Sequence, residues 1–277
     1  MARRIPLARQ TRRAALAVAL GFALTAFALA QAAPPPAQSE AAPATPMSKS
    51  CQPGASALAG ETGLPNVAAA LSQRKTLRIL SFGAAPGRVT SRGGTYTGVI
   101  EAMLAQALKG IEVTIVNRGV SGELAAGAAL RMRNEVALEE PDLVLWQVGT
   151  NDALAYIPVA DFAATVSDQI AWLKEHKVDV VLVGLQFAHR VAQEPHYVAI
   201  RDTLRKIASA ENVPVVRFYE AMQIVNGASE GQLPAAEEFE RNEEGYNCLA
   251  QYVARAITLG VFAKNMPARK PREPAPK

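Results

Sequence analysis

Short apolar runs alternate with amphipathic stretches through most of this chain, and this alternation constrains the fold more than any other feature. The runs predicted to be strands are residues 77–82, 112–117, 142–148, 178–185 and 213–218. The stretches predicted to be helices are residues 96–109, 123–138, 161–176, 196–211 and 243–259. Residues 178–185 are nearly all apolar, as in a strand buried on both faces. The alternation predicts an α/β domain with a parallel sheet covered by helices on both faces.

Both ends of the chain are predicted to lie outside this domain. Residues 1–32 carry several arginines, then an uncharged apolar run, then Ala30-Gln31-Ala32, which is the order of a cleavable signal peptide. The alternative is an uncleaved membrane anchor, but the apolar run is shorter than the ~20 residues that a membrane-spanning helix needs. Residues 33–50, rich in Ala, Pro and Ser, predict a flexible tether, and the basic residues 264–277 predict a disordered tail.

These ends leave one expected domain at residues 51–263 of an exported protein, either periplasmic or secreted, with no membrane span after signal cleavage. They also hold the excess positive charge. The whole chain has 29 basic and 25 acidic residues, a net charge of +4. Residues 33–263 carry 19 basic and 24 acidic residues, a net charge of −5. The basic composition therefore gives no argument for a nucleic-acid partner.

Two cysteines, Cys51 and Cys248, stand at the two ends of the expected domain. In an oxidising export compartment an even pair predicts a disulfide, here between the start of the domain and its last helix. The alternatives are two free thiols or a lipidated Cys51. The polar residues before Cys51 and its distance from the signal peptide argue against lipidation.

The informative loops are those that follow the strands, because sites in open parallel sheets lie beyond the carboxyl ends of the strands. The first strand is followed by Gly83-Ala84-Ala85-Pro86, the second begins the motif Asn117-Arg118-Gly119-Val120-Ser121-Gly122, and the third is followed by Gly149-Thr150-Asn151-Asp152. A glutamate-rich segment, residues 237–244, precedes the last helix. Singly, the second motif could be a glycine turn and the third a helix cap.

In this joint order the motifs resemble the GDSL/SGNH hydrolase superfamily over about residues 76–260. The resemblance implies a flavodoxin-like three-layer α/β/α fold, with a five-stranded parallel sheet in the order 2-1-3-4-5, and an ester hydrolase without a cofactor. It places Gly122 and Asn151 at the positions of oxyanion-hole donors. The family's serine nucleophile, aspartate and histidine fall on Ala85, Glu237 and Glu240.

No alternative register restores the missing catalytic groups. Residues 83–89 contain no Ser, Thr or Cys, no Asp follows Asp202, and no His follows His196. Without a hydroxyl at Ala85 no acyl-enzyme forms there, and an exposed glutamate is a weak base at neutral pH. The leading hypothesis is a pseudoenzyme of the esterase family that binds a small-molecule or envelope-polymer ligand, or a partner, in the cell envelope.

Two alternatives stay open. In the first, a water molecule beside Ala85 is activated by Glu240, with Glu237 raising the pKa of Glu240, and attacks an ester held by Gly122 and Asn151. In the second, the tether and the basic tail form an interaction module. Further candidates for lining the cleft are Gln186, at the tip of the fourth strand, and Asp152. We expect no metal site, because the histidines and carboxylates lack a convincing ligand spacing.

Overall fold

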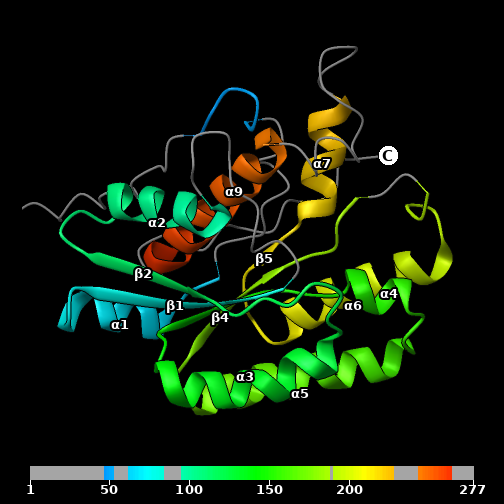
Figure 1. Ribbon diagram of the computed structural model, residues 1–277, viewed down its shortest axis with the longest axis horizontal. Helices are drawn as coiled ribbons and strands as arrows, with labels where there is room; N and C mark the ends of the chain where they lie inside the picture. The colour runs from blue at the N-terminus through cyan, green and yellow to red at the C-terminus, as the bar shows by residue number, and fades with distance from the viewer. Residues whose placement is uncertain (1–46, 53–61, 84–94, 188–189, 228–242, 264–277) are drawn as a thin grey trace, which may run out of the picture. The chain divides into compact units, whose positions relative to one another are not determined.

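Five parallel strands form one sheet in the order β2-β1-β3-β4-β5, in a computed structural model that describes residues 47–52, 62–83, 95–187, 190–227 and 243–263 (Figure 1). The strands are β1 (Thr76–Phe82), β2 (Glu112–Asn117), β3 (Leu143–Gln147), β4 (Asp179–Val183) and β5 (Val215–Val216). The strand order confirms the fold that the resemblance implies. The predicted signal peptide, the tail and most of the tether lie outside the described residues.

Helices cover both faces of the sheet (Figure 1). On one face, α2 (Tyr96–Ala107) packs along α9 (Glu243–Phe262). On the other face, α5 (Val159–Glu175) contacts both α3 (Ala125–Glu139) and α6 (Pro195–Ala210). The short α4 (Thr150–Leu154) lies against α6, and α1 (Pro65–Gln73) contacts β1, β4 and α9. This arrangement is the three-layer α/β/α architecture that the sequence predicts.

Burial along the strands follows from their place in the sheet. Every residue of the interior strand β4 is buried, and all of its residues after Asp179 are apolar, as expected for a strand covered on both faces. The edge strand β2 is partly exposed along its whole length. At the other edge, β5 has two residues where the sequence predicts six, because the chain enters α7 (Phe218–Gly227) immediately after Arg217.

A disulfide joins Cys51 to Cys248 on α9, with the two Cα atoms 5.2 Å apart, which confirms the predicted pairing. Both cysteines are buried. The Tyr252 hydroxyl donates to the Cys51 carbonyl at 2.9 Å, and the Gln251 side chain accepts from the Ser48 N–H at 2.7 Å. Residues near Cys51 therefore belong to the packed domain. Within the described part of the chain, no helix has the length and apolar character that a membrane crossing requires.

Candidate functional site

Two glycines set the backbone at the carboxyl ends of the adjacent strands β1 and β3. Gly83 follows β1 with φ of 122°, and a Cβ on it would lie 2.6 Å from the Cβ of Gln147. Gly149 follows β3 with φ of 104°, and a Cβ there would lie 2.6 Å from Cδ1 of Leu185. Side chains would collide at both positions, so glycine allows these segments to pack closely at the edge where the site is predicted.

Hydrogen bonds hold the loop after β2 against the first turn of α4. The Asn117 Oδ1 accepts from the Gly119 N–H at 3.0 Å, which closes a turn at the end of the strand. The Asn151 side-chain amide donates to the Glu123 carbonyl at 3.0 Å. Gly122, one residue before Glu123, is exposed and has a left-handed φ of 78°. The structure thus brings the segments that carry the two predicted donors, Gly122 and Asn151, together.

Asp152 does not line an open cleft. It is buried and holds the start of α3 against α4. Its side chain is buried, at 2% exposure, and its Oδ1 accepts from the Ala125 N–H at 2.9 Å. That N–H belongs to the first turn of α3, where helical N–H groups have no partner inside the helix. Burial raises the pKa of Asp152, and backbone hydrogen bonds from residues that include Ala125 and Gly149 oppose the shift. The candidate cleft role of Asp152 is therefore replaced by a supporting one.

Arg131 on α3 ties the same loop to the sheet, and the sequence analysis did not identify it. Its guanidinium donates to both Glu123 carboxylate oxygens, at 2.7 and 2.8 Å, and to the Arg118 carbonyl at 2.8 Å. It also lies 5.2 Å from the centre of the Phe82 ring at the end of β1. The hydrogen bond with Glu123 raises the pKa of Arg131. Glu123 lies before the start of α3 and eight positions from Arg131, which is outside the i,i+3 and i,i+4 spacings of helical side-chain pairs, so no local sequence pattern indicated this contact.

Gln186 connects the end of β4 to the same region. Its backbone N–H donates to the Thr150 hydroxyl at 3.1 Å, and its carbonyl accepts from the Tyr197 hydroxyl at 2.6 Å. The side chain of Gln186 is partly exposed. Segments after β2, β3 and β4 therefore converge through Glu123, Asn151 and Thr150. The remaining predicted site residues, Ala85, Glu237 and Glu240, lie outside the described residues.

Histidines take other roles in the described part of the chain. His176 lies at the end of α5, and its Nδ1 is 2.8 Å from the Trp172 carbonyl. His196 stacks on Tyr156, with ring centres 5.3 Å apart. Tyr156 is 65% exposed and has a left-handed φ of 54°, a conformation that bulky residues rarely adopt. Among the residues that the structure describes, no cluster of His, Cys, Asp and Glu side chains could hold a metal ion.

The strand order and the position of these loops define the fold of the GDSL/SGNH hydrolase superfamily. A lipase/acylhydrolase from Enterococcus faecalis superposes with a TM-score of 0.54 at 24% identity, covering 66% of this chain and 95% of that protein. Axe2, an acetylxylan esterase from Geobacillus stearothermophilus, superposes with a TM-score of 0.53 at 19% identity, covering 65% and 94%. These likenesses concern the fold alone.

The chain belongs to the Non-GDSL lipase-like family, whose model matches residues 50–263. Among curated relatives, esterase TesA of Pseudomonas aeruginosa is 27% identical over 140 residues, which are 50% of this chain and 67% of TesA. An arylesterase of Vibrio mimicus is 24% identical over 110 residues, which are 40% of this chain and 54% of that enzyme. The match to the arylesterase thus spans about half of its length.

Proposed function

We propose that the protein is an exported binding protein built on an esterase-like domain, which holds an acyl or carboxyl group without hydrolysing an ester. The observation that carries the proposal is the replacement of all three catalytic positions, by Ala85, Glu237 and Glu240, in a chain that keeps Gly122 and Asn151. The family description, non-GDSL and lipase-like, agrees with the absence of a serine at residue 85. A serine protease that lacks its triad accelerates hydrolysis only ~10³–10⁴-fold over the uncatalysed reaction in water.

The contacts around Asn151 support a binding role for the retained donors. A primary amide has two N–H groups, and the Glu123 carbonyl takes one of those of Asn151 at 3.0 Å. That bond orients the amide, so its other N–H can serve a ligand oxygen. Gly122 stands next to Glu123 on an exposed turn with open space around its Cα. Donors fixed in this way bind an oxygen with little loss of conformational entropy.

The alternative function is ester hydrolysis by a water molecule that Glu240 activates beside Ala85. It has the same binding groups and differs only in its chemistry, so a Glu240→Gln variant separates the two. Loss of turnover in that variant would favour hydrolysis, because glutamine cannot accept the proton of the attacking water. An interaction through the basic residues 264–277 is tested separately, by deleting them and measuring envelope association.

The first experiment tests for triad chemistry. We expect residues 33–277, purified without the signal segment, to hydrolyse p-nitrophenyl acetate no faster than the Asn151→Ala variant does. We also expect no covalent labelling by a fluorophosphonate, since Ala85 has no hydroxyl to phosphonylate. Turnover that disappears in Asn151→Ala, or stoichiometric labelling, would contradict the proposal.

The second experiment tests binding, with acetate as the probe. In a titration followed by ¹⁵N NMR, acetate should shift the Gly122 N–H and the Asn151 side-chain amide in a saturable manner. Asn151→Ala should weaken acetate binding, whereas Leu154→Ala, an exposed change on the same helix α4, should leave it unchanged. Acetate shifts that are equal in both variants would show that Asn151 does not hold the carboxylate.

A further inference from the structure

One side chain, that of Arg131, bridges both ends of the loop that carries Gly122. The Arg131 Nη2 donates to the Arg118 carbonyl, where the loop begins, and to a Glu123 carboxylate oxygen, where it ends, both at 2.8 Å. The Arg131 Nε donates to the other Glu123 oxygen at 2.7 Å. A guanidinium paired with both oxygens of a carboxylate fixes direction as well as distance. We call these three hydrogen bonds the Arg131 clamp.

Between the two ends the chain makes a tight turn over residues 120–123. The Glu123 N–H donates to the Val120 carbonyl at 3.3 Å, and Gly122 inside the turn has φ of 78°. This φ is that of the third residue of a type II turn, which glycine adopts without strain. The direction of the Gly122 N–H therefore depends on the position of Glu123, where the turn ends.

Glu123 also connects the clamp to the second donor, Asn151. Its carbonyl accepts from the Asn151 side-chain amide at 3.0 Å, while its carboxylate, only 12% exposed, is held by Arg131. A movement of Glu123 would thus redirect both the Gly122 N–H and the Asn151 amide.

Arg131 itself is fixed by rigid elements. It lies in the middle of α3, and its guanidinium carbon is 5.2 Å from the centre of the ring of Phe82, the last residue of β1. The first turn of α3 is in turn held by Asp152, which accepts from the Ala125 N–H at 2.9 Å. The clamp therefore fixes a turn with exposed residues to a helix and to the sheet, which position a site more precisely than a loop can.

We propose that Arg131 is a positioning residue of the oxygen-binding site, which acts through Glu123 to align the Gly122 N–H and the Asn151 amide on a ligand. This inference rests on the proposed function, because it concerns the same two donors. Donors that are held in place before binding lose little conformational entropy when the ligand arrives. Loss of the clamp should therefore weaken binding although no contact with the ligand is removed.

The first measurement needs no ligand. ¹⁵N relaxation of residues 33–277 gives order parameters for the Gly122 N–H and the Asn151 side-chain amide, and in Arg131→Gln both should fall toward the values of flexible groups, below ~0.6. Arg133→Gln is the matched control, because Arg133 is on the same helix with its guanidinium over the Trp172 ring of α5. Order parameters in Arg131→Gln that equal those of the wild type and of Arg133→Gln would overturn the proposal.

The second measurement is the acetate titration of the same variants. Arg131→Gln should weaken acetate binding about threefold or more, the factor that corresponds to ordering one mobile side chain on binding. Arg131→Lys keeps the positive charge but lacks the planar pair of donors, so it should bind as weakly as Arg131→Gln. It also replaces Arg131→Gln in both measurements if circular dichroism shows that the glutamine variant is unfolded.

Glu123→Ala separates positioning from charge. It breaks the clamp and also removes a negative charge, so positioning predicts weaker acetate binding, whereas attraction by the field of Arg131 alone predicts tighter binding. Tighter binding in Glu123→Ala, or a wild-type Kd in Arg131→Lys, would overturn the proposal.

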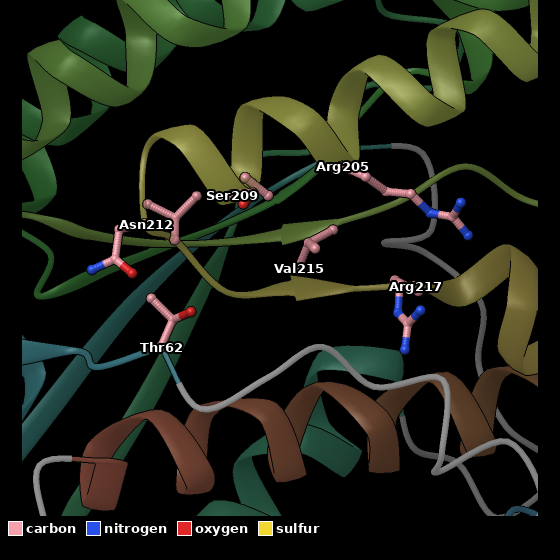
Figure 2. Close-up of a pocket in the computed structure, with 8 residues that line it drawn as sticks. Thr62, Arg205, Ser209, Asn212, Val215 and Arg217 are labelled. Carbon is pink, nitrogen blue, oxygen red and sulfur yellow. The ribbon is translucent and has the colours of Figure 1, made fainter. Parts of the chain in front are cut away.

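Acetate has a second place to bind, a cavity of about 410 Å³ beside β5. Figure 2 shows Arg205 and Arg217 among the residues that line this cavity. Arg217→Gln should leave the acetate-induced shift of Gly122 unchanged, and loss of that shift would place the bound acetate at β5 and overturn the proposal. If the wild type binds no acetate, the proposed function fails, and the order parameters alone decide whether Arg131 positions the two donors.

Discussion

Two glycines of the site region have left-handed backbone conformations in different surroundings. Gly122 has φ of 78°, and a Cβ on it would meet nothing within 4 Å. Gly149 has φ of 104°, and a Cβ there would lie 2.6 Å from Leu185 Cδ1 and 3.4 Å from Phe162 Cζ. An alanine at the first position would add only backbone strain, whereas an alanine at the second would add a collision in the core.

The first prediction compares Gly122→Ala with Gly149→Ala. Gly122→Ala should lower the free energy of unfolding by about 1 kcal/mol, the backbone cost of a left-handed alanine. Gly149→Ala should lower it by roughly 2–4 kcal/mol, since overpacking adds to that cost. Urea unfolding followed by circular dichroism measures both. Equal losses would mean that the chain relaxes around residue 149 and that the close packing there is not required.

The second prediction concerns the pH dependence of stability. Burial raises the pKa of Asp152 in the folded protein, so the folded state holds its proton more tightly than the unfolded state does. The resulting stability is fully present below the unfolded pKa of about 3.9 and is lost as pH rises through the folded pKa. The wild-type advantage over Asp152→Asn should therefore shrink as pH rises from about 4 toward neutrality.

Urea midpoints at a series of pH values measure this difference, and Asp161→Asn corrects for the loss of one negative charge. Asp161 is exposed in the first turn of α5. A wild-type advantage over Asp152→Asn that stays constant or grows with pH would show that the backbone hydrogen bonds to Asp152 outweigh its burial.

The candidate site could be predicted from the sequence where a residue belongs to a short motif. Gly122 and Asn151 stand at fixed places in motifs that follow strands, and the Asn151–Glu123 hydrogen bond joins the two segments. Arg131 and Tyr156 could not be predicted, because their roles arise from contacts made across elements. Arg131 reaches Phe82, 49 positions earlier in the chain, and Tyr156, in the turn after α4, stacks on His196 of α6. Local sequence patterns carry no trace of such contacts.

At the scale of elements, strand order was predictable and several helices were not. The five apolar runs and their order follow from the alternation and the family resemblance. The helix α7 was missed because residues 213–218 are rich in Val and Phe, which favour strands, yet the helix starts at Phe218. The helix α4 has five residues, too few for a periodic pattern. Helix and strand ends also differ from the prediction by a few residues.

Asp179 connects two elements that lie far apart in the sequence, α1 and β4. Its Oδ2 accepts from the N–H groups of Asn66 and Val67, both at 2.9 Å, and its Oδ1 accepts from the Asn66 side chain at 2.8 Å. A carboxylate at the start of a helix satisfies free N–H groups and interacts favourably with the helix dipole. Here the cap comes from the first residue of a strand, so it fixes α1 against the sheet.

The third prediction is that Asp179→Ala lowers the free energy of unfolding by roughly 2–3 kcal/mol, because buried donors lose their acceptor. Asp179→Asn should cost less, since its amide oxygen can still accept. Thermal unfolding of both variants, with the exposed change Asp161→Asn as a control, provides the comparison. If amide exchange of Val67 were no faster in Asp179→Ala than in the wild type, the carboxylate would not be holding α1.

At the scale of the whole molecule, one covalent link spans most of the folded chain. The bond between Cys51 and Cys248 closes a loop with a sequence separation of 197 residues. The N-terminal segment is also held by the Tyr252 hydroxyl on the Cys51 carbonyl and by Gln251 on Ser48. The disulfide therefore adds to a packed interface on α9, and it does not substitute for one.

The fourth prediction concerns the contribution of this disulfide. In the chain-entropy account, closing so long a loop stabilises the folded state by about 5 kcal/mol, and native disulfides commonly contribute ~2–5 kcal/mol. The free energy of unfolding of the double variant Cys51→Ser with Cys248→Ser should be lower by an amount in that range, so the variant should have a lower Tm. It should stay folded at 25 °C because the contacts of Tyr252 and Gln251 remain. Reductant should lower the Tm of the wild type and leave that of the double variant unchanged. If reductant shifted neither Tm, the two cysteines would not be joined in the purified protein. If the double variant were unfolded at 25 °C, the disulfide itself would be what attaches the N-terminal segment to α9.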